Sequence, residues 1–258
     1  MRVFKSLYAG VVILVLTSLS MFAASFWTGD ALAPAINTVQ FVLVLLSLVM
    51  AFYLFLKLDK SSLGRPIWGL VSIALLIDIV AVFCELINGY ARSWRISQET
   101  VFLIYLFVWL VLIVIPAALY MLFKRSGFEF KKEAYYSVIP PLAVVTVVAV
   151  VVVLVPLLRS DLDIGTKISN FVATLVGLAV LYFVLFVVVT IGEGQLGRPW
   201  LFLSFCVASI VIQTIVTTNV IIVLGYMRVL EPGNFFLHLG YGFLLVAEAY
   251  QYRILRGL

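Results

Sequence analysis

Three polar side chains follow one face of a long apolar segment, IALLIDIVAVFCELIN, and could carry protons or bind a solute. Asp78 and Glu85 are seven residues apart, and Asn88 follows about one turn later, so a helix places all three on one face. The small residues Ala74 and Ala81 complete that face. A stripe of polar and small residues in a membrane helix normally faces the helix bundle or a wet cavity.

The depth of Asp78 makes its carboxyl the most informative of the three. It lies 12 residues after Pro66, which is about 18 Å along a helix and near the middle of a bilayer. An ionised carboxylate at this depth is costly, so we expect Asp78 to be protonated or in contact with water. Two interpretations stay open: Asp78 takes part in moving protons or a solute, or it only joins helices through a hydrogen bond.

A second polar stripe occurs in the apolar segment 199–224. Gln213 lies at nearly the depth of Asp78, and Ser209 and Thr217 share its face. Such residues often only join helices, but two stripes at matching depth favour a path between them. The residues that we predict to line this path are Asp78, Glu85, Asn88, Gln213, Thr217 and Asn219.

His238 and Glu248, in the last apolar segment, are weaker candidates. A single histidine without a second ligand at helical spacing favours packing or an interfacial hydrogen bond, so we predict no metal site. Glu248 either lines an inner vestibule or extends to the interface. The sequence has no G-x-S-x-G, H-E-x-x-H, C-x-x-C or P-loop motif, so an enzyme is not favoured and we expect no cofactor.

The composition identifies the class of protein that must position these residues. The chain is 65% hydrophobic and 11% charged, whereas soluble domains are about 25% charged. We therefore predict an all-α, multi-pass protein of the cell membrane. Eight apolar segments are long enough to be transmembrane helices: 7–26, 36–56, 66–88, 101–123, 136–158, 168–190, 199–224 and 235–252. The first resembles a secretory signal, but its length favours a retained helix.

The positive charges predict the orientation. If both termini are cytoplasmic, the inner side holds 12 of the 17 lysines and arginines: Arg2, Lys5, Lys57, Lys60, Arg65, Lys124, Arg125, Lys131, Lys132, Arg198, Arg253 and Arg256. Short loops follow this bias. The net charge of +5 then fits anionic lipids at the cytoplasmic face and requires no nucleic acid. The sequence leaves open a homo-oligomer or partner membrane subunits.

The string LGRP occurs at Leu63–Pro66 and again at Leu196–Pro199, each time ahead of an apolar segment on the inner side. At the same offset, Asn37 corresponds to Asn170. We therefore predict a duplication, residues 1–132 and 133–258, in one membrane domain without a soluble part. Four helices per half would make the repeats parallel, and such repeats place their sites at the interface between halves.

The residues of LGRP have local roles. We expect Gly64 to permit a tight turn, Arg65 to lie among the headgroups and Pro66 to fit the first helical turn. Trp68 and Trp200 should then lie in the inner aromatic belt. Cys84 and Cys206 are at depths that differ by about 16 Å along parallel helices, so we predict two free thiols.

Three functions remain, in decreasing order of preference. The first is a transporter or permeation protein for an ion or small solute, with its polar site at the repeat interface. The second is a non-transporting membrane module, such as a sensor or a structural or quinone-facing subunit of a larger complex. The third is a lipid-modifying enzyme that uses Asp78 and Glu85. A water-accessible cavity that reaches Asp78 would favour the first over the second.

Overall fold

A computed structural model of the chain describes residues 33–62, 64–90, 132–161, 164–191, 198–224 and 230–257. It also describes the isolated positions 12, 16, 20, 96, 104, 107, 110, 111, 114, 121 and 124. Within these residues all regular structure is helical, which confirms the predicted all-α class. The predicted helices 7–26 and 101–123 lie outside the described residues, apart from isolated positions.

The other six predicted segments coincide with helices that extend a few residues further. The helices are α2 (Ala33–Lys57), α3 (Gly64–Tyr90), α5 (Lys132–Ala149), α6 (Val155–Arg159), α7 (Ile164–Ile191), α8 (Arg198–Leu224) and α9 (Leu230–Leu255), and a π-helical turn, Val150–Leu154, joins α5 to α6. By length and composition, two described stretches could cross a membrane: Pro34–Lys57 and Gly64–Asn88.

The turn between α2 and α3 is closed by the backbone. The Ser62 N–H donates to the Asp59 carbonyl at 2.9 Å, and the Arg65 N–H donates to the Ser62 carbonyl at 3.2 Å. Gly64 is the first residue of α3 and has no positive φ. The predicted role of glycine in permitting the tight turn is therefore wrong. Pro66 occupies the first turn of α3, where its missing N–H leaves no hydrogen bond unmade.

The π-helical turn Val150–Leu154 has a cause in the sequence. Pro156 follows it, lacks an N–H, and would clash with the carbonyl of the residue four positions earlier in a regular α-helix. The Val155 N–H instead donates to the Val150 carbonyl, five residues back, which widens the helix just before the proline. The apolar segment 136–158 is thus interrupted where the sequence places Pro156.

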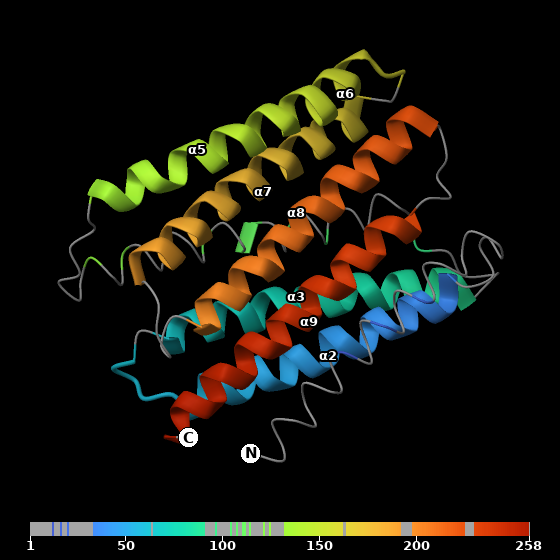
Figure 1. Ribbon diagram of the computed structural model, residues 1–258. Helices are drawn as coiled ribbons and strands as arrows, with labels where there is room; N and C mark the ends of the chain where they lie inside the picture. The colour runs from blue at the N-terminus through green and yellow to red at the C-terminus, as the bar shows by residue number, and fades with distance from the viewer. Residues whose placement is uncertain are drawn as a thin grey trace.

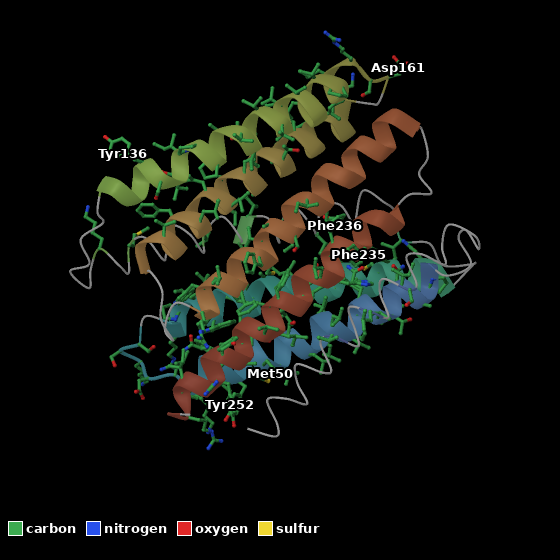
Figure 2. All side chains as sticks on the ribbon, in the orientation of Figure 1. Met50, Tyr136, Asp161, Phe235, Phe236 and Tyr252 are labelled. Carbon is green, nitrogen blue, oxygen red and sulfur yellow. The ribbon has the colours of Figure 1, made fainter. Side chains whose placement is uncertain are left out.

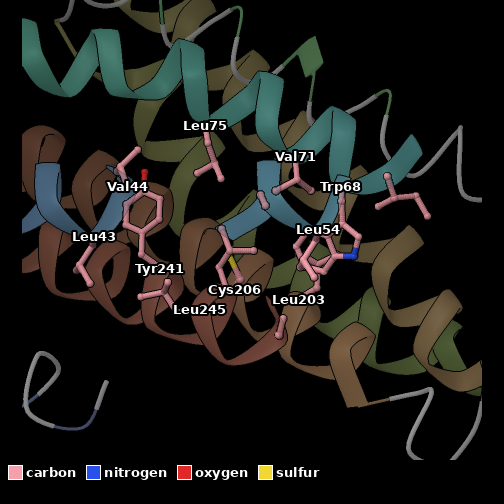
Figure 3. Packing of buried hydrophobic residues seen from close by; sticks show 14 of the residues in the cluster. Leu43, Val44, Leu54, Trp68, Val71, Leu75, Leu203, Cys206, Tyr241 and Leu245 are labelled. Atoms are coloured by element: carbon pink, nitrogen blue, oxygen red, sulfur yellow. The ribbon is translucent and has the colours of Figure 1, made fainter. Parts of the chain in front are cut away.

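Four helices from both ends of the chain surround one apolar core. Helix α9 packs against α2 and α8. Helix α3 packs on α2, α7 packs on α8, and α5 packs on α7. Helices α2 and α9 run in one direction, and α3 and α8 run in the other (Figure 1). The core includes Leu54 of α2, Val71 of α3, Leu203 of α8 and Leu245 of α9 (Figure 3).

Trp68 belongs to this core. Its side chain is 1% exposed and clusters with Leu54 and Leu58, so the indole lies inside the bundle, and its depth in the inner aromatic belt stays a prediction. The indole lies in the first turns of α3, beside the C-terminal end of α2 (Figure 3). Trp200, at the other LGRP, is only half-buried.

The outer surfaces of the bundle are apolar. Large hydrophobic side chains are exposed along α2, including Val49 and Phe52, and along α5, including Val144 and Val147. Helix α5 lies at the edge of the bundle, and Tyr136 projects from its outer side (Figure 2). Such a surface suits contact with lipid chains and not with water.

Candidate functional site

Asp78 lies in the core of the bundle and bonds to a distant helix. Its side chain is 6% exposed, in the second half of α3. The Tyr241 hydroxyl of α9 donates a hydrogen bond to Asp78 Oδ2. Tyr241 is itself buried among core residues of α2 and α8 (Figure 3). One carboxyl group therefore joins a helix of the first half of the chain to a helix of the second.

Glu248 adds a second buried acid on the same helix as Tyr241. It is 0% exposed and lies seven residues, or two helical turns, after Tyr241, so both side chains occupy one face of α9. Within the described part of the chain, neither carboxyl oxygen of Glu248 has a hydrogen-bond partner. Buried polar groups are nearly always satisfied by protein, water or an ion, so this carboxyl indicates a binding position for a small polar species.

Two uncharged polar residues of α2 are equally deep. Gln40 and Ser47 are 1% and 0% exposed, and their side-chain polar atoms also lack a hydrogen-bond partner among the described residues. They are seven residues apart, so they lie on one face of α2. That face is buried along its length, because Ile36, Val44 and Ala51 lie on it.

The register between α2 and α9 brings these polar residues to matching levels. Tyr53 and Tyr252 contact each other with ring centroids 5.9 Å apart, and the two helices are parallel. Counting back from this pair, Ser47 lies within about 3 Å of the level of Glu248 along the axis, and Gln40 within about 1.5 Å of that of His238. We call these residues, with Asp78 and Tyr241, the polar column.

Cys206 of α8 is buried in the same core as Tyr241. The carboxyl groups of Glu248 and Asp78 both act electrostatically on its buried thiol. Helix α8 reaches this position because α9 has a glycine opposite it: a Cβ on Gly240 would be 3.3 Å from the Cys206 carbonyl oxygen. Close approach at small residues is the usual device of membrane helix pairs.

The predicted residues of the α3 stripe have different environments. Asp78 is buried and bonded across the bundle, whereas Glu85 is half-buried. The Asn88 amide binds the backbone of Ile96: its Nδ2 donates to the Ile96 carbonyl at 3.1 Å, and its Oδ1 accepts from the Ile96 N–H at 2.7 Å. Asn88 thus holds the chain that leaves α3, which is sufficient reason for an amide there.

The α8 stripe is only partly described. Ser209 is buried beside Gly240, and Gln213 is half-buried. Thr217 and Asn219 lie in α8, but their side chains are outside the described part of the structure. The structure therefore joins Asp78 to Tyr241 of α9 and places Ser209 of α8 beside Gly240 of α9.

His238 and Glu248, the weaker candidates, are among the most buried polar residues described, at 2% and 0% exposed. The described residues contain no group of three His, Cys, Asp or Glu side chains that could hold a metal ion. Cys84 and Cys206 are both buried and free, which confirms the predicted thiols. The buried polar groups of the described residues thus include carboxyl, phenol, imidazole and thiol groups, which can exchange protons, besides amide and hydroxyl groups.

Sequence reasoning missed Tyr241, Gln40 and Ser47. A tyrosine in an apolar helix usually lies at a membrane interface, and single Gln or Ser residues usually join helices. The available signal was the spacing: Gln40 and Ser47, like Tyr241 and Glu248, are separated by seven residues. Two such pairs on different helices predict facing polar stripes, although not which helices meet.

Three arginines at one end of the bundle stack on aromatic rings. The Arg65 guanidinium lies 5.2 Å from the Phe55 ring centroid, and that of Arg198 lies 5.7 Å from Tyr250. Arg256 lies 5.4 Å from the ring centroid of Tyr252. Hydrogen bonds with Tyr252 and Tyr53 raise the pKa of Arg256, which keeps it charged. These three cations therefore gather where α3 and α8 begin and α9 ends.

Comparison of the chain with protein-family models, with curated proteins and with solved structures yields no match. The function must therefore be inferred from the chemistry of the polar column and from the apolar surface that surrounds it.

Proposed function

We propose that this chain is a multi-pass protein of the cell membrane that moves an ion or small solute, with protonation of Asp78 as part of the cycle. One observation carries the proposal: a buried acid in α3 is bonded to Tyr241 of α9, across the two halves of the chain. Acidic residues inside membrane helices are costly and are commonly retained for ion or proton pathways.

The proposed membrane topology has eight transmembrane helices and cytoplasmic termini. Its support is the apolar length of α2 and α3, the exposed apolar side chains of α2 and α5, and the distribution of lysine and arginine. Arg65, Arg198 and Arg256 would then lie at the cytoplasmic face. There their guanidinium groups would meet the phosphates of anionic lipids, the partner that we propose for this end.

The proposed halves, 1–132 and 133–258, form a parallel tandem repeat. At the offset of 133 residues, α2 corresponds to α7 and α3 to α8. Helices α2 and α3 pack together, as do α7 and α8. Arg65 and Arg198 correspond at the same offset, and each stacks on an aromatic ring. The polar column then lies where α2 and α3 of one half meet α9 of the other, as in parallel-repeat transporters.

Protonation of Asp78 gives the site two states. In the ionised state its carboxylate accepts the hydrogen bond from Tyr241, and this charge-assisted bond is strong. In the protonated state the carboxyl is neutral and bonds Tyr241 more weakly. Loss and gain of the proton therefore alter the bond between α3 and α9, which couples proton exchange to the contact between the halves.

A second function, a non-transporting membrane module, is favoured by the tight burial of Asp78. A 6% exposed carboxyl with a hydrogen-bond donor from another helix also suits a permanent joint between helices. In a sensor or a structural subunit, the bond would hold the helices together and protons would not pass. The two functions differ in whether Asp78 exchanges protons with water.

Proton flux in vesicles separates the two functions. The purified chain is reconstituted with a pH-sensitive dye inside, and a potassium diffusion potential drives protons inward. We expect a flux that Asp78→Asn reduces by about tenfold or more, because the amide keeps the shape and loses the exchangeable proton. Ser72→Ala is the control, since the Ser72 hydroxyl bonds the Trp68 carbonyl of its own helix at 2.7 Å. A wild-type flux equal to that of Asp78→Asn would reject the transport function.

A further inference from the structure

We infer that Glu248 is a second proton-exchanging carboxyl, linked to Asp78 by water that the polar column binds, so that the species passing this site is the proton. The inference rests on the proposed function and makes it specific. It starts from the polar column: Gln40 and His238 toward one end, Asp78 and Tyr241 in the middle, and Ser47 and Glu248 toward the other.

Burial without a protein partner is the first support. The polar atoms of Gln40, Ser47 and Glu248 are enclosed, and they have no hydrogen-bond partner within the described residues. An unsatisfied buried polar group costs about 1–3 kcal/mol, and more if it is charged. Three such residues on facing helices would carry a large penalty in a dry core, and water is the partner that removes it.

The composition of the column identifies the ligand. A metal ion would need several oxygen or nitrogen ligands around one point, and the described residues hold no such acidic or histidine cluster. A larger solute would need an open cavity lined by apolar groups. Hydroxyl, amide and carboxyl groups in single file suit water, which donates and accepts at each step. The proton is the cargo that such a file can pass.

The spacing between the two acids requires an intermediary. Tyr241 and Glu248 are seven residues apart on α9, which is about 10.5 Å along the helix and too far for direct proton transfer. Beside this stretch of α9 lie the polar residues Cys206 of α8 and Ser47 of α2, together with the buried apolar side chains of Leu244 and Leu245. About three waters, with four O–H···O bonds of about 2.8 Å each, bridge a gap of this length.

A proton would then cross in balanced steps. Glu248 in its protonated form donates to the adjacent water, and that water releases a proton to the next. Asp78 accepts the proton at the end of the file and becomes neutral, while Glu248 is left ionised and takes a new proton from the inner side. No bond to carbon forms or breaks, and no oxidant or metal takes part.

The native thiol provides a test of hydration that does not depend on flux. Cys84→Ala leaves Cys206 as the single thiol of the chain, because the sequence has 2 cysteines. Its S–H stretch is then followed by infrared spectroscopy after transfer of the membranes to D₂O. Water beside Cys206 exchanges the thiol hydrogen within minutes. An S–H band that persists for hours would overturn the water file, and Cys206→Ala identifies the band by removing it.

Flux through Glu248→Gln completes the test. The amide keeps the size of the side chain and removes the exchangeable proton, so we expect proton flux to fall by about tenfold or more. Gln251→Leu, one turn further along α9 and half-buried, is the control for a change at this end of the helix. If Asp78→Asn reduces the proton flux and Glu248→Gln leaves it unchanged, the relay through Glu248 is overturned and the proposed function stands. A wild-type chain without Asp78-dependent flux would overturn the proposed function and the relay with it.

Discussion

The Tyr241 hydroxyl donates a hydrogen bond to the carboxyl of Asp78, and the two residues are 163 positions apart in the sequence. This bond is buried, and it joins α3 to α9 inside the core that α2 and α8 complete. The same contact holds the helices together and carries the proposed function. A change to either partner should therefore affect both the stability of the fold and the proton flux.

The bond between Asp78 and Tyr241 should be measurable as a coupling energy. Asp78→Leu and Tyr241→Phe each remove one partner, and Asp78→Leu leaves a buried hydroxyl unsatisfied at about 1–3 kcal/mol. The double variant should lose less unfolding free energy than the sum of the single ones, by about 1 kcal/mol. Denaturant titration in detergent measures all four chains. Strict additivity would show that the two groups do not interact.

The shape of Asp78 should matter less to folding than its polarity. Asp78→Asn still offers an oxygen to the Tyr241 hydroxyl, so its thermal midpoint in detergent should lie much closer to wild type than that of Asp78→Leu. Equal destabilisation by both substitutions would instead mean that an ionised carboxylate is needed for the fold.

Gly240 should resist enlargement. A Cβ there would meet the Cys206 backbone carbonyl at 3.3 Å, and the branched side chain in Gly240→Val would force α8 and α9 apart. We expect a loss of about 1–3 kcal/mol in unfolding free energy. Gly64→Ala is the matched control, because its new Cβ would have its nearest neighbour at an ordinary 3.5 Å. A neutral Gly240→Val would mean that the helix pair is not closely packed here.

Cysteine labelling should report the orientation of the loops. In a chain with Cys84 and Cys206 replaced by alanine, Ser61→Cys lies in the exposed turn between α2 and α3, and Asp161→Cys lies in the exposed turn after α6 (Figure 2). A membrane-impermeant maleimide added to intact cells should label position 161 and leave position 61 unlabelled. The reverse pattern would contradict the cytoplasmic termini.

The duplication makes a prediction about an experimental structure of the whole chain. Residues 1–132 should superpose on 133–258 through a rotation about the membrane normal, with α2 on α7 and α3 on α8. An odd number of transmembrane helices, or halves related by inversion, would contradict the tandem repeat.

Much of the helical structure could be predicted from the sequence, because the length of an apolar segment predicts a helix and LGRP predicts where a helix begins. The starts of α3 and α8 follow from Pro66 and Pro199, which lie in the first turns of these helices. Depth along α3 likewise singled out Asp78. The role of Gly64 in the turn was predicted wrongly, and the burial of Trp68 was not predicted, since both depend on how the end of α2 packs back on α3.

The partners of Asp78 could not be predicted, for a different reason. Periodicity identifies a face of a helix, but which two faces meet depends on the packing of all helices together. Tyr241 and Glu248 repeat at the spacing of a buried face, yet the same spacing would suit an interfacial tyrosine and a solvated acid. The contact between Tyr53 and Tyr252 gives the register between α2 and α9, and in this register the polar residues of the two helices lie at matching levels.

The long separation of Asp78 from Tyr241 also has a consequence for biogenesis. At about 5–20 residues per second, the ribosome needs roughly 8–33 s to add the 163 residues between them. During that interval α3 is already synthesised while its hydrogen-bond donor does not yet exist. A chain that stops before α9 keeps the acid and never receives the donor. A chain that lacks α9 would therefore leave the Asp78 carboxyl without its tyrosine partner.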